Sequence, residues 1–425
     1  MVDRRLARLI VLAINLALGA SGQAQQAQDS DKATIQALVQ EVKDLRLRVE
    51  KLEAEKEGKP APQVVEAAVQ TPQTTPQPTP ELSPETEAPV EQSEMSRMDP
   101  GKTLLRMRGF GDVTFHGDNQ KGSTTSFTLG QLDLFITSDV SEKFRFLGEV
   151  VFEAEQNTNS YGVDVERLLM QYAPKDWLNV SVGRYHTAIG YYNTAYHHST
   201  WLQTTTGRPF LFEFEDKGGI LPIHNVGVSV TGLIPSGSLG LHYIAEVGNG
   251  RASRDPVNQE AVQNVVDENN RKAVNLGFFV RPQWKQGLQA GMSVYYDLLQ
   301  PNNSPRIGET ILAGHVIYER PNFEWLNEAL VIRHDIRGGR TYNTPGFYTQ
   351  FSKRFGSYRP YFRYQYLNVA NTEPVFSDVG LQHGPSVGIR FDPSESVALK
   401  LQYDYTSERN HESFSGLAAQ LGFTF

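Results

Sequence analysis

Six basic side chains stand in segments where polar and apolar residues alternate with a period of two. They are Arg145, Arg167, Arg333, Arg363, Arg390 and Lys400. Because successive side chains of a strand point to opposite faces, the apolar neighbours would share one face and these cations the other. Cations along a polar wall concentrate anions by electrostatic attraction. Each cation could instead pair with a carboxylate such as Asp133, Glu149 or Glu166 and merely stiffen the wall, and the sequence leaves both interpretations open.

A long polar segment, residues 186–225, carries a second group of charged and imidazole side chains. The group consists of Arg184, just before the segment, and His197, His198, Arg208, Glu213, Glu215 and Asp216 within it. If the segment folds against a basic wall, its three carboxylates would set a transverse electric field across a constriction. The alternative is an acidic loop that is only exposed to solvent.

The sequence offers little for covalent catalysis or for metal binding. It has no Cys, so thiolate chemistry is excluded. The adjacent pair His197-His198 lacks the i, i+4 spacing of a helical zinc motif, and no H-E-x-x-H occurs. His197, His198 and Ser199 are neighbours, but no G-x-S-x-G is present, so a membrane-bound hydrolase is the weakest alternative. We expect no catalytic residue, no metal site and no cofactor.

Alternation continues to the last residue of the chain. Leu417, Ala419, Leu421, Phe423 and Phe425 fall on one face, and smaller or polar residues fall on the other. Roughly fifteen earlier segments show the same alternation of apolar and polar residues. Each is about ten residues long, which is the length of a tilted strand that crosses a bilayer.

The connections between these segments fall into two classes. Short turns are expected at 139–143, 173–177, 235–238, 281–287, 319–324, 354–358 and 392–396. Longer, polar or Gly-rich loops are expected near 116–124, 154–162, 186–225, 248–271, 299–306, 335–342, 368–383 and 406–413. Seven turns that alternate with eight loops predict about sixteen antiparallel strands with both ends on the short-turn side. We therefore predict an all-β transmembrane barrel over residues 101–425.

The first hundred residues have a different organisation. A basic start, a short apolar run and small residues before position 25 predict a signal peptide at 1–24. A heptad pattern predicts a short coiled-coil helix at 31–57, and a Pro-rich stretch at 58–100 predicts an extended linker. The heptad residues favour a parallel dimer, whereas a barrel of this kind favours a trimer, which we expect because its contacts are larger. A lone amphipathic helix is the alternative to self-association.

Composition supports this organisation. The mean hydropathy is −0.41, and no stretch after residue 24 has eighteen consecutive apolar residues, so no spanning helix is expected. The 425-residue chain carries a formal net charge of −8. A nucleic-acid partner, which needs a clustered basic field, is not expected.

Three segments carry a resemblance to a known family. Residues 131–153, the stretch from Gly183-Arg184-Tyr185 through 225, and the final strand resemble the phosphate-selective porin O and P superfamily. The heptad helix before a barrel is similar to the dicarboxylate-channel branch of coiled-coil porins. The resemblance implies a trimeric sixteen-strand channel for small anions, with the loop after the fifth strand folded into the lumen. It does not extend to the lysine cluster of phosphate channels, so phosphate specificity is not implied.

These observations together predict a bacterial outer-membrane porin. We expect passive diffusion of small hydrophilic solutes, with a preference for anions and with loop 186–225 narrowing the lumen. The expected partners are small anionic or polar solutes, outer-membrane lipid and two further copies of the chain, with a possible peptidoglycan contact from a periplasmic coil. The alternatives are an envelope tether with a closed barrel and, less favoured, an outer-membrane hydrolase.

Overall fold

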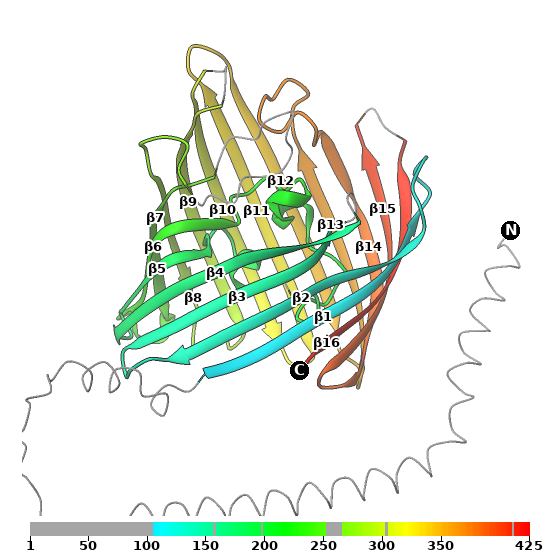
Figure 1. The fold of residues 1–425 in the computed structure, drawn as a ribbon, viewed down its shortest axis with the longest axis horizontal. Helices are drawn as coiled ribbons and strands as arrows, with labels where there is room; N and C mark the ends of the chain where they lie inside the picture. Colours follow the sequence, from blue (N-terminus) through cyan, green and yellow to red (C-terminus); the bar gives the residue numbers. More distant parts are fainter. Residues whose placement is uncertain (1–104, 156–158, 197–198, 252–265, 302–304, 410–411) are drawn as a thin grey trace, which may run out of the picture. The chain divides into compact units, whose positions relative to one another are not determined.

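The computed structural model describes residues 105–155, 159–196, 199–251, 266–301, 305–409 and 412–425. The expected signal peptide, coiled-coil helix and linker lie outside these residues, as do His197 and His198. Sixteen antiparallel strands form one closed barrel, in which each strand pairs with its neighbours in sequence and β1 pairs with β16 (Figure 1). The prediction of a sixteen-strand antiparallel barrel is confirmed.

The strands are β1 (Leu105–Asp118), β2 (Ser126–Asp139), β3 (Phe144–Glu155), β4 (Ser160–Lys175), β5 (Leu178–His186), β6 (His224–Ile234), β7 (Leu241–Gly248), β8 (Ala273–Val280), β9 (Leu288–Leu299), β10 (Ile307–Arg320), β11 (Phe323–Ile336), β12 (Thr341–Lys353), β13 (Tyr358–Asn368), β14 (Leu381–Ser394), β15 (Val397–Glu408) and β16 (Phe414–Thr424). Short helical turns are α4 (Tyr192–Ala195), η3 (Phe210–Phe212), η4 (Glu215–Lys217) and η5 (Gly237–Leu239). Within the described ranges, no helix is long and apolar enough to cross a membrane.

The predicted turns and the predicted loops lie at opposite ends of the barrel, although the predicted loop between β11 and β12 (337–340) is shorter than the predicted turn between β8 and β9 (281–287). The seven predicted turns join β2 to β3, β4 to β5, β6 to β7, β8 to β9, β10 to β11, β12 to β13 and β14 to β15. The first described strand starts and the last one ends on this short-turn side, since Leu105 pairs with Ser138 and Phe110 pairs with Thr424. The longest connection between consecutive strands joins β5 to β6. All of its residues except His197 and His198 have a described backbone.

Exposed apolar side chains cover the outer surface of the barrel. On β16, Leu417 and Leu421 are exposed, whereas Gln420 between them is buried. A β-bulge in β4 changes this phase, because Glu149 of β3 pairs with Arg167 while the next residue pairs with Val165. The extra residue lets two successive side chains of β4 face inward together. The inward-facing and outward-facing positions of β4 therefore exchange at this bulge, while the strand itself continues.

Gly183 of β5 occupies a position that a side chain would not fit. Its φ is 135°, and a Cβ atom there would overlap the backbone oxygen of Leu168 on β4. We expect Gly183→Ala to lower the free energy of unfolding by about 2 kcal/mol or more, because the strand backbone must shift. Urea unfolding followed by tryptophan fluorescence measures this. Gly314→Ala is the matched control, since the nearest atom to its added Cβ is 3.8 Å away. Equal midpoints for the two variants would contradict the steric argument.

Candidate functional site

The connection between β5 and β6, residues 187–223, turns into the barrel and contacts inward-facing side chains (Figure 1). Its first part is held by carboxylates of two strands. The backbone N–H of Ala188 donates to Glu246 of β7 at 3.0 Å, and the N–H of Tyr192 donates to Glu328 of β11 at 2.9 Å. Charged acceptors strengthen such hydrogen bonds, so the start of the loop is fixed to this wall.

Three basic side chains further around the barrel, on β13–β15, hold the middle of the loop. Each donates to a backbone carbonyl at 2.8 Å: Arg363 of β13 to Gly207, Arg390 of β14 to Trp201 and Lys400 of β15 to Thr205. Arg363 and Lys400 are almost completely buried. The three side chains expected to line an open passage therefore act as anchors of the loop, a role that neither interpretation of the sequence included, although Arg390 also pairs with Asp392 at 2.7 Å.

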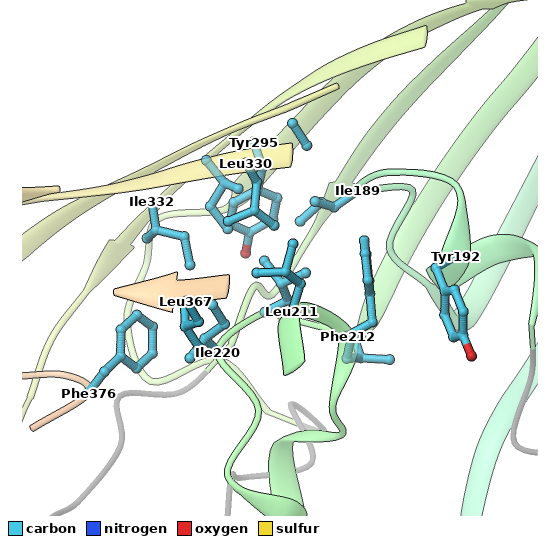
Figure 2. Packing of buried hydrophobic residues seen from close by; sticks show 14 of the residues in the cluster. Ile189, Tyr192, Leu211, Phe212, Ile220, Tyr295, Leu330, Ile332, Leu367 and Phe376 are labelled. Atoms are coloured by element: carbon cyan, nitrogen blue, oxygen red, sulfur yellow. The ribbon is translucent and has the colours of Figure 1, made fainter. Parts of the chain in front are cut away.

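An apolar cluster joins the loop to strands β8–β13. Figure 2 shows how Leu211 and Phe212 of the loop lie beside Leu330 and Leu367 of the wall. All four side chains are at most 4% exposed. Burial of each such side chain contributes about 1.5–3 kcal/mol, so the loop is held by packing on this side and by charged hydrogen bonds on the other.

This cluster corrects the expectation for Arg333. The neighbouring Ile332 points inward and belongs to the cluster, so Arg333 lies on the outer face of β11 beside exposed Val331. The sequence analysis assigned apolar residues to the lipid side. On β11 both faces are apolar in part, because the inward face packs against the loop.

The remaining basic candidates have carboxylate partners. Arg145 pairs with Asp139 at 3.3 Å, Arg167 pairs with Glu149, and Arg184 pairs with Glu166 at 3.8 Å. Arg145 is exposed beside a short turn, whereas Arg167 and Arg184 are buried. The second interpretation of the sequence, in which wall cations pair with wall carboxylates, describes these three residues.

Within the loop, Arg208 stabilises the fold of the loop itself. It donates to the carbonyl of Tyr196 at 3.2 Å and to that of Phe212. Its guanidinium carbon lies 4.1 Å from the ring centre of Phe214, a cation–π contact. Burial lowers the pKa of Arg208, and nearby Tyr192 and acidic groups oppose that shift.

Of the three acidic residues predicted in the loop, Glu215 has a partner on β6. Glu215 accepts hydrogen bonds from the backbone N–H and from Nδ1 of His224 at 3.0 and 3.3 Å. Burial alone would raise the pKa of Glu215, but the charge and hydrogen bonds of His224 outweigh burial and lower it. Glu213 is half-buried, and the side chain of Asp216 lies outside the described structure. Glu215 is therefore bound to the strand that follows the loop.

A cavity of about 600 Å³ lies between the start of the loop and strands β4–β10. Five basic or imidazole side chains line it: Arg167, His186, His242, Arg281 and His315. Asp176 is the carboxylate among its described lining residues. Arg281 donates to Gln289 at 2.8 Å, and its guanidinium carbon lies 4.9 Å from the ring centre of Phe279. Arg281 follows a strand and carries no alternation signal, so it was not among the residues predicted from the sequence.

No evidence of catalysis comes from the described residues. No group of three or more His, Asp or Glu side chains in that part of the chain is arranged to hold a metal ion. Ser199, the third member of the sequence cluster considered for hydrolysis, is buried, and its two His neighbours lie outside the described ranges.

Comparison with known proteins shows the fold. No family model matches the sequence, and no curated protein matches it. Among solved structures, the barrel is similar to an anion-selective porin from Comamonas acidovorans, at 13% identity with a TM-score of 0.54 over 76% of this chain and 100% of the other. It is also similar to the outer-membrane channel DcaP of Acinetobacter baumannii, at 10% identity, a TM-score of 0.53 and coverage of 77% and 99%. OmpF of Salmonella typhi has 9% identity, a TM-score of 0.52 and coverage of 76% and 98%. The described chain thus has the sixteen-strand barrel fold of outer-membrane porins.

Proposed function

We propose that this protein is an outer-membrane porin through which small hydrophilic solutes diffuse passively. The observation that carries the proposal is a closed sixteen-strand barrel with an apolar outer surface. Such a barrel spans a bilayer and keeps a polar interior. Short turns on the periplasmic side and long loops outside would orient it. The similarity in fold to the porins named above also supports this proposal.

The loop of residues 187–223 narrows this channel. Support comes from its attachment at several positions around the wall, including Glu246 on β7 and Lys400 on β15, which are eight strands apart in the sixteen-strand barrel. A segment held from both sides reduces the cross-section open to solutes and sets the size limit. The assembly is proposed to be a trimer, as the resemblance to the phosphate-selective porin superfamily implies. The peptidoglycan contact remains a prediction for residues outside the described structure.

Conductance in a planar lipid bilayer tests the proposal. The refolded chain is expected to give discrete conductance steps grouped in threes. A correctly folded barrel that stays silent would reject the channel and favour the envelope tether.

A preference for anions is proposed on the basis of the basic cavity. We expect Arg281→Gln to lower the anion-to-cation permeability ratio by about tenfold, since one charge at about 5 Å in water stabilises an anion by about 0.8 kcal/mol and destabilises a cation by the same amount. The measurement is the reversal potential under a salt gradient. Arg320→Gln is the control, because Arg320 bonds to Gln286 at the same end and does not line the cavity. Identical reversal potentials for the two variants would show that Arg281 does not contribute to the ion selectivity of the channel.

A further inference from the structure

Four exposed arginines gather at the long-loop end of β10, β11 and β12. We call them the outer arginine cluster, and they are Arg306, Arg333, Arg337 and Arg340. The backbone N–H of Arg337 donates to the carbonyl of Arg306 at 3.0 Å, and the N–H of Ile336 donates to the carbonyl of Arg340 at 3.2 Å. These bonds bring the ends of three neighbouring strands together, so the four residues occupy one area of the surface.

The part of the chain that the structure describes offers these four guanidinium groups no ion pair. Among the described residues, no carboxylate lies within ion-pair distance of any of its four guanidinium groups. Three buried arginines, Arg167, Arg184 and Arg251, differ from the cluster in that each has a carboxylate partner. Asp335 is the acidic side chain nearest in sequence, and it accepts a hydrogen bond from Thr341 at 2.9 Å. With Asp335 exposed between Arg333 and Arg337, the cluster therefore presents a net positive charge outward among the described residues.

Arg333 marks the depth of the cluster relative to the apolar band. It lies on the outer face, eight positions after Trp325, which is stacked on Phe351 near the short turns. Eight residues span about 26 Å along a strand, or about 20 Å across the membrane at a tilt of about 40°. The apolar band of such barrels is about 25 Å tall. Arg333 thus lies close to the outer boundary of that band.

The neighbours of Arg333 across the sheet agree with this depth. In register, Tyr296 of β9 pairs with Thr310 of β10, Thr310 pairs with Arg333, and Arg333 pairs with Asn343 of β12. Tyr296 is 51% exposed, and exposed tyrosine is typical of the level where lipid head groups begin. A row of one aromatic, two neutral polar residues and an arginine suits the boundary between hydrocarbon and head group.

We infer that the outer arginine cluster binds the phosphate groups of an anionic lipid in the leaflet at the long-loop end. This inference rests on the proposed placement of the barrel in an outer membrane. The planar guanidinium fork matches phosphate oxygens in a bidentate geometry. Basic residues beside a membrane surface gain from anionic head groups. An arginine at the edge of the hydrocarbon layer is also stabilised when its guanidinium group reaches the lipid phosphates.

Lipid binding by the full-length protein in phosphatidylcholine nanodiscs tests this. The probe is a bisphosphorylated glucosamine lipid, lipid A, compared with the same lipid after removal of its phosphates. We expect Arg333→Gln/Arg337→Gln to weaken binding of the phosphorylated lipid at least about tenfold, the effect of losing charge-assisted hydrogen bonds. The control, Arg106→Gln/Arg320→Gln, removes the same charge at the short-turn end and should change binding less than about twofold.

Three results would overturn the inference. One is equal weakening by both double variants, and another is equal binding of the phosphorylated and dephosphorylated lipids. The third is displacement of the lipid by inorganic phosphate at a matching phosphate concentration, which would identify a site for the free ion. Conductance of the same preparations is recorded in parallel, because a silent channel would reject the proposed function whichever lipid result is obtained.

Discussion

The triple variant Arg363→Gln/Arg390→Gln/Lys400→Met is expected to raise the permeability of the barrel to neutral sugars about twofold or more, because a wider constriction passes more solute. Each native side chain donates a charged hydrogen bond to the loop segment 201–207. Such bonds contribute about 1.5–3 kcal/mol each. Without them this segment keeps only neutral hydrogen bonds to this wall, such as that from the N–H of Thr206 to Gln402 of β15 at 3.1 Å, and we expect it to loosen while the apolar cluster still holds the rest of the loop.

Swelling of liposomes in sugars of increasing size measures this effect, since neutral solutes do not report the lost charge directly. The matched control is Arg333→Gln/Arg337→Gln/Arg340→Gln, which removes the same charge from the outside of the barrel. It should leave sugar permeability unchanged. If the two triple variants swell at the same rate, the anchors do not determine the width of the channel. An unchanged size limit for sugars in the variant Arg363→Gln/Arg390→Gln/Lys400→Met would lead to the same conclusion.

The second large effect is expected for Glu309→Ala. Glu309 of β10 is completely buried and joins Arg251, from the loop after β7, to His334 of β11 at 2.7 Å. His334 in turn contacts Glu373, from the loop after β13, at 2.7 Å. Removal of the central carboxylate leaves a buried guanidinium without its partner, which costs about 3–5 kcal/mol. The loss of stability is measured by the urea midpoint, which should fall, and by the rate of proteolysis in the two loops, which should rise.

A compensating variant separates the lost pair from a general loss of packing. Arg251→Met/Glu309→Leu removes both charges together, and buried ion pairs replaced by apolar residues are often neutral in stability. The double variant should therefore recover most of the stability that Glu309→Ala loses. Glu412→Ala, at an exposed position, serves as the surface control. If the double variant is as unstable as the single one, the cost comes from shape and not from the unpaired charge.

Strand number, turn positions and loop positions could all be predicted from the sequence, because their causes are local. Alternation with a period of two follows from strand geometry, and turn residues interrupt it wherever the chain reverses. The register between β1 and β2 shifts between Gly111 and Val113, at the point where Gly130 interrupts the alternation of β2. There the side chain of Asp112 lies over the glycine, in the space that a Cβ would occupy, and accepts a hydrogen bond from the N–H of Gln131 at 3.1 Å.

The roles of the charged residues could not be predicted in the same way. A cation on a polar face looks the same in sequence whether its partner is a solute, a carboxylate or a backbone carbonyl. Lys400 and Thr205 are 195 positions apart, and only the folded loop brings them to 2.8 Å. Arg281 was missed for a related reason, since the cavity that it lines is formed by seven strands and a loop together.

Arg333 shows most directly where the sequence stops being informative. By itself the sequence determined that this chain forms a barrel of sixteen strands with seven short turns and a long fifth connection. Only the tertiary structure decided which apolar face of β11 meets lipid, because Ile332 is buried by Leu211 and its neighbours, which come from a distant part of the chain. Hydrophobic burial has no direction of its own. An apolar face packs equally well against lipid or against a loop, so the position of the loop decides which side of the barrel each charge occupies.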